Sequence, residues 1–174
     1  DTCSVNMLVI DGGEPKILPL LSILDNYIAF QKSVIVKRTQ FDLDKALKEL
    51  HILEGYRIAT DNIEEVIEIK KSESIPAAKE SLKERFGLSD EQAQAIVDMT
   101  LGKLSGLERQ KVEDRIEKLT AIVADLRDIL ESEGRVEEIL KNELTEIKTK
   151  FGDKRRTEIV EATEEIDLED LIER

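Results

Sequence analysis

The sequence predicts a mainly α-helical protein: a long antiparallel coiled-coil arm, a small helical globular knob at its tip and a short N-terminal β-hairpin. The first indication is composition, because aromatic residues make up only 3% of the 174 residues and charged residues 37%. A compact core of this size normally relies on aromatic side chains for buried area, whereas Leu, Ile, Glu and Lys are typical of long helices. The second is a pair of long helical patterns, and the third is a cluster of helix-capping signals between them.

The N-terminal pattern predicts the β-hairpin. Asn6–Ile10 is a short apolar run, Asp11-Gly12-Gly13-Glu14-Pro15 is a turn signal, and Lys16–Leu18 follows as the second strand. Because a two-stranded hairpin is marginal alone, we expect further strands of the same sheet to precede Asp1. The sequence has no initiator Met, so we expect it to be a fragment of something longer.

The descending arm is predicted to be one helix. Pro19 suits a first helical turn, and nothing interrupts the pattern from Leu20 until Gly55. Apolar residues line one side and lapse only in a polar patch at residues 37–40. That stripe consists of Leu20, Leu21, Leu24, Ile28, Ile35, Leu43, Leu47, Leu50 and Leu53. A long helix with a one-sided stripe must lie against another element.

Two short helices are predicted to open the knob, residues 59–104. Asp61 and Glu64 form a capping pair at the start of the first. Pro76 starts the second, which ends at Phe86 before Gly87.

A third knob helix is predicted over about residues 90–101, followed by a turn from Gly102 to Ser105. It lies between two predicted capping boxes, Ser89-x-x-Gln92 and Ser105-x-x-Glu108. Gly87 and Gly102 stand where left-handed residues are expected to end helices.

The returning arm carries the most regular pattern. Its apolar residues are spaced alternately by four and three: Val112, Ile116, Leu119, Val123, Leu126 and Leu130. This spacing is a coiled-coil seam. Gly134 is predicted to end that helix and to be a candidate bend, and a second helix should run to Phe151 before Gly152.

We therefore expect five segments. They are a β-hairpin (1–18), a descending coiled-coil helix (19–58), a helical knob (59–104), returning coiled-coil helices (105–150) and an extended acidic segment (151–174).

The sequence offers little for catalysis. The net charge is −13 and none of the segments is basic, so no surface is predicted to grip phosphates tightly. Cys3 is the only cysteine and His51 the only histidine. These two residues are too few for a catalytic triad or for the ligand set of a zinc site. No phosphate-binding loop, signal peptide or membrane-spanning run is present. We therefore predict no catalytic residue, cofactor, metal or membrane contact in this fragment.

The third knob helix has two faces to explain. One is apolar and should pack on the other knob helices, through Ala93, Ile96, Val97 and Leu101. Gln92, Ala95 and Met99 form a second, mildly apolar face. It could be a partner-contact surface, or the helix could simply be buried on two sides.

Several segments resemble the A subunit of bacterial DNA gyrase, in that family's order and spacing over nearly the whole chain. They are residues 34–43, residues 51–55, residues 89–99, residues 104–109 and residues 151–159. The first begins Val34-Ile35-Val36-Lys37-Arg38, the third begins Ser89-Asp90-Glu91-Gln92-Ala93, and the last begins Phe151-Gly152-Asp153-Lys154-Arg155.

The resemblance implies the coiled coil and exit gate (C-gate) of a type IIA topoisomerase. Two A subunits would close the gate by knob contact, and a transported DNA duplex would leave through it during ATP-dependent supercoiling. With the second face described above, this makes Gln92, Ala95, Asp98 and Met99 the expected dimer interface. The catalytic tyrosine would lie upstream of Asp1, so the fragment alone should be inactive.

The resemblance also implies partners. ATP and Mg²⁺ would enter through the gyrase B subunit in the A2B2 holoenzyme, and DNA would contact this fragment weakly or not at all. The location would be the bacterial cytoplasm, in association with the chromosome, and a linker would lead to a DNA-wrapping C-terminal domain. Two alternatives stay open: the equivalent part of topoisomerase IV, and a non-enzymatic helical scaffold or adaptor.

Overall fold

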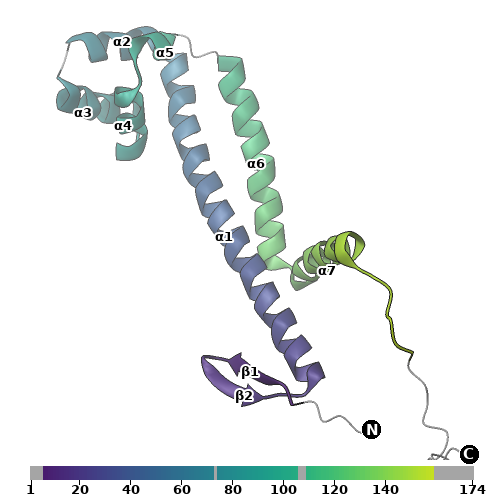
Figure 1. Ribbon diagram of the computed structural model, residues 1–174. Helices are drawn as coiled ribbons and strands as arrows, with labels where there is room; N and C mark the ends of the chain where they lie inside the picture. The colour runs from purple at the N-terminus through teal and green to yellow at the C-terminus, as the bar shows by residue number, and fades with distance from the viewer. Residues whose placement is uncertain (1–5, 73, 106–108, 159–174) are drawn as a thin grey trace, which may run out of the picture. The chain divides into compact units, whose positions relative to one another are not determined.

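The computed structural model describes residues 6–72, 74–105 and 109–158 (Figure 1). Its elements run in the order β1 (Leu8–Asp11), β2 (Glu14–Ile17), α1 (Leu20–Asp61), α2 (Ile63–Ser72), α3 (Ile75–Phe86), α4 (Asp90–Asp98), α5 (Leu101–Ser105), α6 (Arg109–Glu131) and α7 (Glu133–Phe151). The chain divides into two compact units, residues 1–140 and residues 141–174. The predicted mainly helical fold with an N-terminal hairpin is confirmed.

The hairpin pairs β1 with β2 in antiparallel register, with Leu8 opposite Ile17. Its two turn residues, Gly12 and Gly13, have φ angles of 61° and 86°. Tight two-residue hairpins need positive φ at both positions, which glycine adopts at no steric cost. The Gly-Gly pair therefore sets the register.

Helix α1 packs along α6 (Figure 1). Arg115 of α6 bonds Glu49 of α1 at 2.7 Å, and Lys32, earlier in α1, bonds Glu137 of α7 at 2.6 Å. Later residues of the returning arm thus meet earlier residues of α1, so the two helices are antiparallel. The seam buries Val112, Leu119 and Val123 as predicted, but ends on Ile129 rather than on the half-buried Leu130.

The predicted lapse in the α1 stripe was wrong. Thr39, inside the polar patch, is only 5% exposed and lies between the buried Ile35 and Leu43. These three residues are spaced by four, so they share one helix face, and a threonine methyl group continues the stripe. At the other end, Leu20, Leu21, Leu24 and Ile28 are 40–74% exposed, so no described part of the chain covers them.

Gly55 does not end α1, which continues through it to Asp61. A Cβ built on Gly55 would lie 2.9 Å from Cβ and Cγ of Gln92 on α4. The glycine is therefore a site of close helix approach and not a terminator. Since Asp61 still belongs to α1 and α2 begins at Ile63, the predicted Asp61–Glu64 cap was also wrong.

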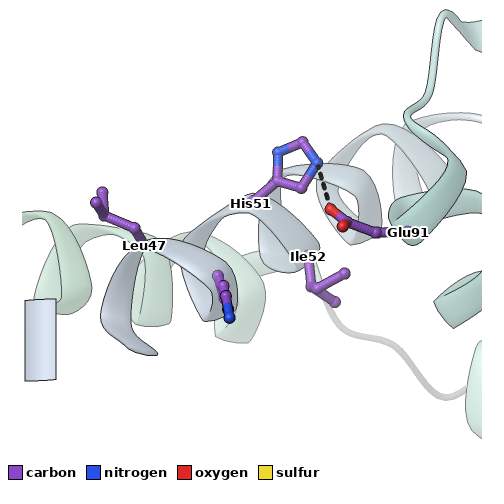
Figure 2. A pocket seen from close by; sticks show the side chains of 5 residues that line it. Leu47, His51, Ile52 and Glu91 are labelled. Atoms are coloured by element: carbon purple, nitrogen blue, oxygen red, sulfur yellow. Dashed lines mark ion pairs between the residues drawn. The ribbon is translucent and has the colours of Figure 1, made fainter. Parts of the chain in front are cut away.

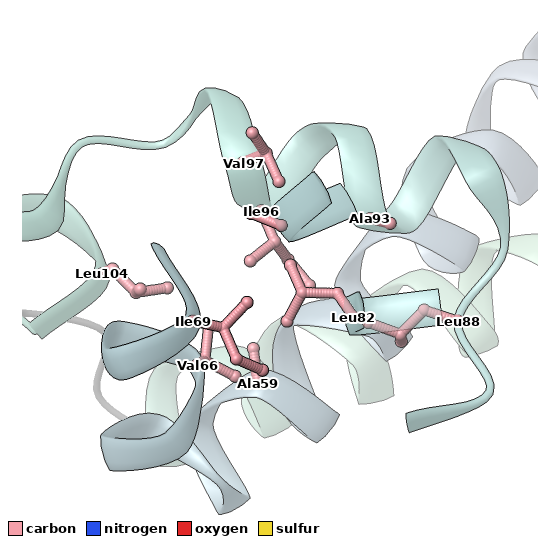
Figure 3. Packing of buried hydrophobic residues seen from close by; sticks show 10 residues of the cluster. Ala59, Val66, Ile69, Leu82, Leu88, Ala93, Ile96, Val97 and Leu104 are labelled. Atoms are coloured by element: carbon pink, nitrogen blue, oxygen red, sulfur yellow. The ribbon is translucent and has the colours of Figure 1, made fainter. Parts of the chain in front are cut away.

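The knob helices α2–α5 share a hydrophobic core with the end of α1 (Figure 3). Its buried members are Ala59, Val66, Ile69, Ala78, Leu82, Leu88, Ala93, Ile96, Val97 and Leu104. Ala93, Ile96 and Val97 of α4 point into this cluster, as the periodicity predicted. Leu101, the fourth residue of the predicted face, belongs to α5, and its side chain lies outside the described part of the structure. Pro76 lies in the first turn of α3, and Gly87 ends α3 with φ 65°.

The third knob helix is shorter than expected. Helix α4 ends at Asp98, Met99 is extended, and α5 covers Leu101–Ser105. Gly102 therefore lies inside a helix, without positive φ, and the predicted turn there was wrong. The second capping box extends over residues 106–108, outside the described residues.

The returning arm is interrupted at Ser132, not at Gly134, which lies in the first turn of α7. The Ser132 carbonyl accepts bonds from the N–H groups of Arg135 and Val136 at 3.1 and 3.3 Å. The Arg135 guanidinium bonds Asp125 and Asp128 of α6 at 3.0 and 2.5 Å. A serine junction thus separates the helices while charged side chains bridge it.

The second unit, in its described part, contains the rest of α7 and a non-helical segment. Helix α7 ends at Phe151, as predicted, and residues 152–158 are irregular. In the described parts of the chain, no helix combines the length and apolar character that a membrane crossing requires.

The close approach at Gly55 gives a testable prediction. Gly55→Ala should lower the free energy of unfolding by about 1–2 kcal/mol, because overpacking against Gln92 outweighs the better helix propensity of alanine. Urea unfolding followed by circular dichroism measures it.

Gly134→Ala is the matched control, since its Cβ would meet only Ser132 Oγ at 3.8 Å. It should be neutral or stabilising by up to about 1 kcal/mol. If Gly55→Ala were equally well tolerated, the close helix contact would not be a constraint on folding.

Candidate functional site

A shallow hollow lies where α4 gives way to α5. Its volume is about 340 Å³, and the residues that line it are Tyr56, Ala95, Asp98, Met99, Thr100 and Lys103. We call these six residues the α4–α5 surface. Three of the four residues predicted to form a contact face (Ala95, Asp98 and Met99) therefore lie together on one surface.

Gln92, the fourth, lies elsewhere. It is only 6% exposed and is buried between α4 and α1, against Gly55. Its side-chain amide donates to the His51 carbonyl oxygen at 2.7 Å, and its Oε1 accepts from the Ser89 N–H at 3.0 Å. Within the chain, Gln92 anchors α4 to α1, while a role in partner contact stays a prediction.

A polar network at the start of α4 completes this anchor. Ser89 Oγ accepts from the Gln92 N–H at 3.2 Å, which with the reciprocal bond forms the predicted capping box. His51 of α1 places its Nε2 2.6 Å from the same Oγ. Through this contact, the sole histidine joins α1 to the cap of α4.

His51 also borders a second hollow, of about 480 Å³, on the α1 side of this junction (Figure 2). Leu47, Lys48, Ile52 and Glu91 are its other lining residues. The Glu91 carboxylate lies 3.9 Å from His51 Nε2, which makes an ion pair when the imidazole is protonated.

Lys70 of α2 holds the other end of α4. Its ammonium group donates to the carbonyl oxygens of Ile96 and Val97 at 3.1 and 2.8 Å, and also to that of Met99. An ammonium group has three donors, so all three are satisfied here. A positive charge beside the last carbonyls of a helix is favourable, so Lys70 fixes the backbone that presents Asp98 and Met99.

Burial and charge shift two groups near this surface. Burial lowers the pKa of Lys70, and the Asp98 carboxylate opposes that shift. Burial raises the pKa of the Tyr56 phenol, and Asp98 adds to the increase. The exposed negative charge of Asp98 thus raises the pKa of both Lys70 and Tyr56 relative to the effect of burial alone.

The described residues contain no group of three or more His, Cys, Asp or Glu side chains that could hold a metal ion. The α4–α5 surface is a patch of mixed apolar and charged character.

Comparison with known proteins identifies the family. The family model for the A subunit of DNA gyrase/topoisomerase IV matches residues 1–145. The chain belongs to this family. The resemblance noted in the sequence is therefore confirmed over most of the chain.

Curated relatives agree. The chain is 48% identical to the DNA gyrase A subunit of Clostridium acetobutylicum over 174 residues, covering 99% of this chain and 21% of that protein. It is 52% identical to the Streptococcus pneumoniae protein of the same name over 170 residues, covering 97% and 21%. For the Helicobacter pylori protein the identity is 48% over 172 residues, covering 98% and 21%. The chain thus spans about a fifth of the length of these gyrase relatives.

Sequence reasoning missed several residues that shape the site. No sequence pattern singles out Lys70, because its partners in and directly after α4 lie 26–29 positions away. Tyr56 and Lys103 join the α4–α5 surface from α1 and α5, which no local pattern could show. For Gly55, the only available signal was a glycine in an otherwise helical pattern.

The cap on α4 gives a second prediction. Lys70→Met should lower the free energy of unfolding by about 1–3 kcal/mol, because three backbone carbonyls lose a charged donor. Thermal and urea unfolding measure the change. Lys71→Met, at the exposed neighbour, is the matched control and should stay within about 0.5 kcal/mol. Equal effects of the two variants would contradict the capping role.

Proposed function

We propose that this chain is the coiled-coil arm and dimerising exit gate of a gyrase A subunit. Membership of the gyrase A family carries this proposal. In the proposed gate, the transported DNA duplex leaves between two copies of the knob during ATP-dependent supercoiling. The fragment supplies adhesion and release, and the catalytic tyrosine lies in another part of the longer protein.

The geometry supports a gate in two ways. The antiparallel pairing of α1 with α6 forms an arm, and the knob packs on the last turns of α1 (Figure 1). The α4–α5 surface is fixed from both ends of α4, by the His51–Ser89–Gln92 network and by Lys70. A surface that must repeatedly close on its twin benefits from such pre-organisation, because less ordering entropy is lost at each contact.

The proposed contact consists of Ala95, Asp98 and Met99. Gln92 is left out of the surface because its side chain is engaged within the knob. Small residues beside a methionine allow close and adaptable packing between helices.

The holoenzyme we propose contains two such A subunits and two B subunits, with ATP and Mg²⁺ entering through B, in the bacterial cytoplasm. The matching family model covers both gyrase and topoisomerase IV, so the equivalent part of topoisomerase IV is the second candidate. The three relatives named above, which match over nearly the whole chain, are gyrase proteins, and this favours the first candidate.

The acidic character of the chain suits passage of DNA. With a net charge of −13, the walls of the gate would repel a duplex rather than retain it. Lysine and arginine contacts to phosphate release counterions and would slow the departure of the duplex.

Cysteine cross-linking tests the gate. In a Cys3→Ser background, Ala95→Cys and Met99→Cys should each give covalent dimers on mild oxidation, because symmetry places a residue near a twofold axis close to its own copy. Non-reducing electrophoresis and light scattering of the parent chain measure the result.

The matched control is Ala124→Cys on an exposed position of α6, which should stay uncross-linked. Failure of both knob cysteines with a dimeric parent would mean that another face forms the gate. A parent chain that stays monomeric at high micromolar concentration would contradict the proposal and favour an adaptor.

Charge reversal tests the passage hypothesis. Glu64→Lys, Glu91→Lys and Glu117→Lys together, all at exposed positions, should strengthen DNA binding and steepen its salt dependence. The matched control replaces the same residues by Gln, which removes charge without adding a phosphate ligand. Fluorescence anisotropy with a short duplex measures affinity, and an unchanged affinity of the Lys variant would refute the idea.

A further inference from the structure

The α4–α5 surface carries one charge of each sign. Asp98 and Lys103 both line its hollow and both are exposed. Within the described part of the chain, neither side chain has an ion-pair partner. The Asp98 carboxylate instead accepts a hydrogen bond from the Gln94 amide, at 2.8 Å.

Asp98 occupies an unfavourable position for a carboxylate. It is the last residue of α4, where the helix dipole is negative and a basic residue would be preferred. Lys70, whose ammonium group interacts electrostatically with Asp98, directs its three donors to backbone carbonyls. Among the residues that the structure describes, the Asp98 charge therefore has no direct counter-ion.

We infer that Asp98 of one copy pairs with Lys103 of a second copy, and Lys103 of the first with Asp98 of the second. This inference rests on the proposed gate. A twofold interface must be self-complementary, because each residue that contacts a second residue is contacted by that residue in return. A single patch that carries both charges beside a hollow satisfies that requirement. A partner surface of one charge sign would instead repel either Asp98 or Lys103.

The two pairs frame an apolar centre. Ala95, Met99 and Tyr56 are half-buried and line the same hollow, so they can exclude water from the centre of the contact. Ion pairs at the edge of such a contact set its register and exclude wrong partners more than they add affinity. They also give a gate that loosens as the ionic strength rises.

Mixing two charge-reversed chains tests the pairing. Asp98→Lys alone places Lys against Lys in its own dimer, and Lys103→Asp alone places Asp against Asp. Each variant should dimerise about 10-fold or more weakly than the parent. In an equimolar mixture the two variants restore both attractive pairs, so heterodimers should form with an affinity within about threefold of the parent. Native mass spectrometry and sedimentation velocity at low salt measure both species.

The control is the pair Glu64→Lys and Lys71→Asp, the same charge reversals at exposed positions of α2 outside the surface. Those variants should dimerise like the parent, with no preference for heterodimers. If the Asp98 and Lys103 variants weaken dimers but do not favour the heterodimer, or have no effect, the pairing is wrong while the gate stands. A monomeric parent would instead overturn the gate itself.

Discussion

The close contact between α1 and α4 is the constraint on which the knob depends. Gly55 lets the two helices approach until Gln92 fills the space where a Cβ would lie. Gln92 then bonds the His51 carbonyl, and His51 reaches the Ser89 cap. A buried amide is tolerated only when its donors and acceptor are satisfied, so this contact selects one arrangement of the helices. The positions of Ala95, Asp98 and Met99 follow from it.

At the other end of α4, a charged side chain satisfies backbone groups, as the Gln92 amide does at the start of the helix. Lys70 supplies the donors that the last carbonyls of α4 would otherwise lack. Side-chain hydrogen bonds therefore hold both ends of α4, which is only nine residues long. Short helices are marginal alone, and tertiary packing provides most of their stability.

In the proposed gate, a face that is held from both ends of its helix would meet and leave the same face of a second copy. The gyrase A family, to which the chain belongs, provides the setting for the proposed exit gate. The α4–α5 surface combines an apolar centre with both charge signs, a combination that favours a specific but reversible contact. Negative charge elsewhere on the chain would weaken DNA binding and shorten the time for which a duplex stays bound.

The sequence by itself determined the helical class, the hairpin turn, the ends of α3 and α7 and the Ser89 capping box, because these depend on residues within a few positions. Helical periodicity also grouped Gln92, Ala95 and Met99 on one face of α4, and the family resemblance added Asp98 to the expected contact. Only the tertiary structure decided that α1 continues through Gly55, that Gln92 points inward and that Lys70 caps α4. In each of these the deciding partner lies more than 25 positions away along the chain. Local propensity carries no information about such distant contacts, so tertiary packing decided these three features.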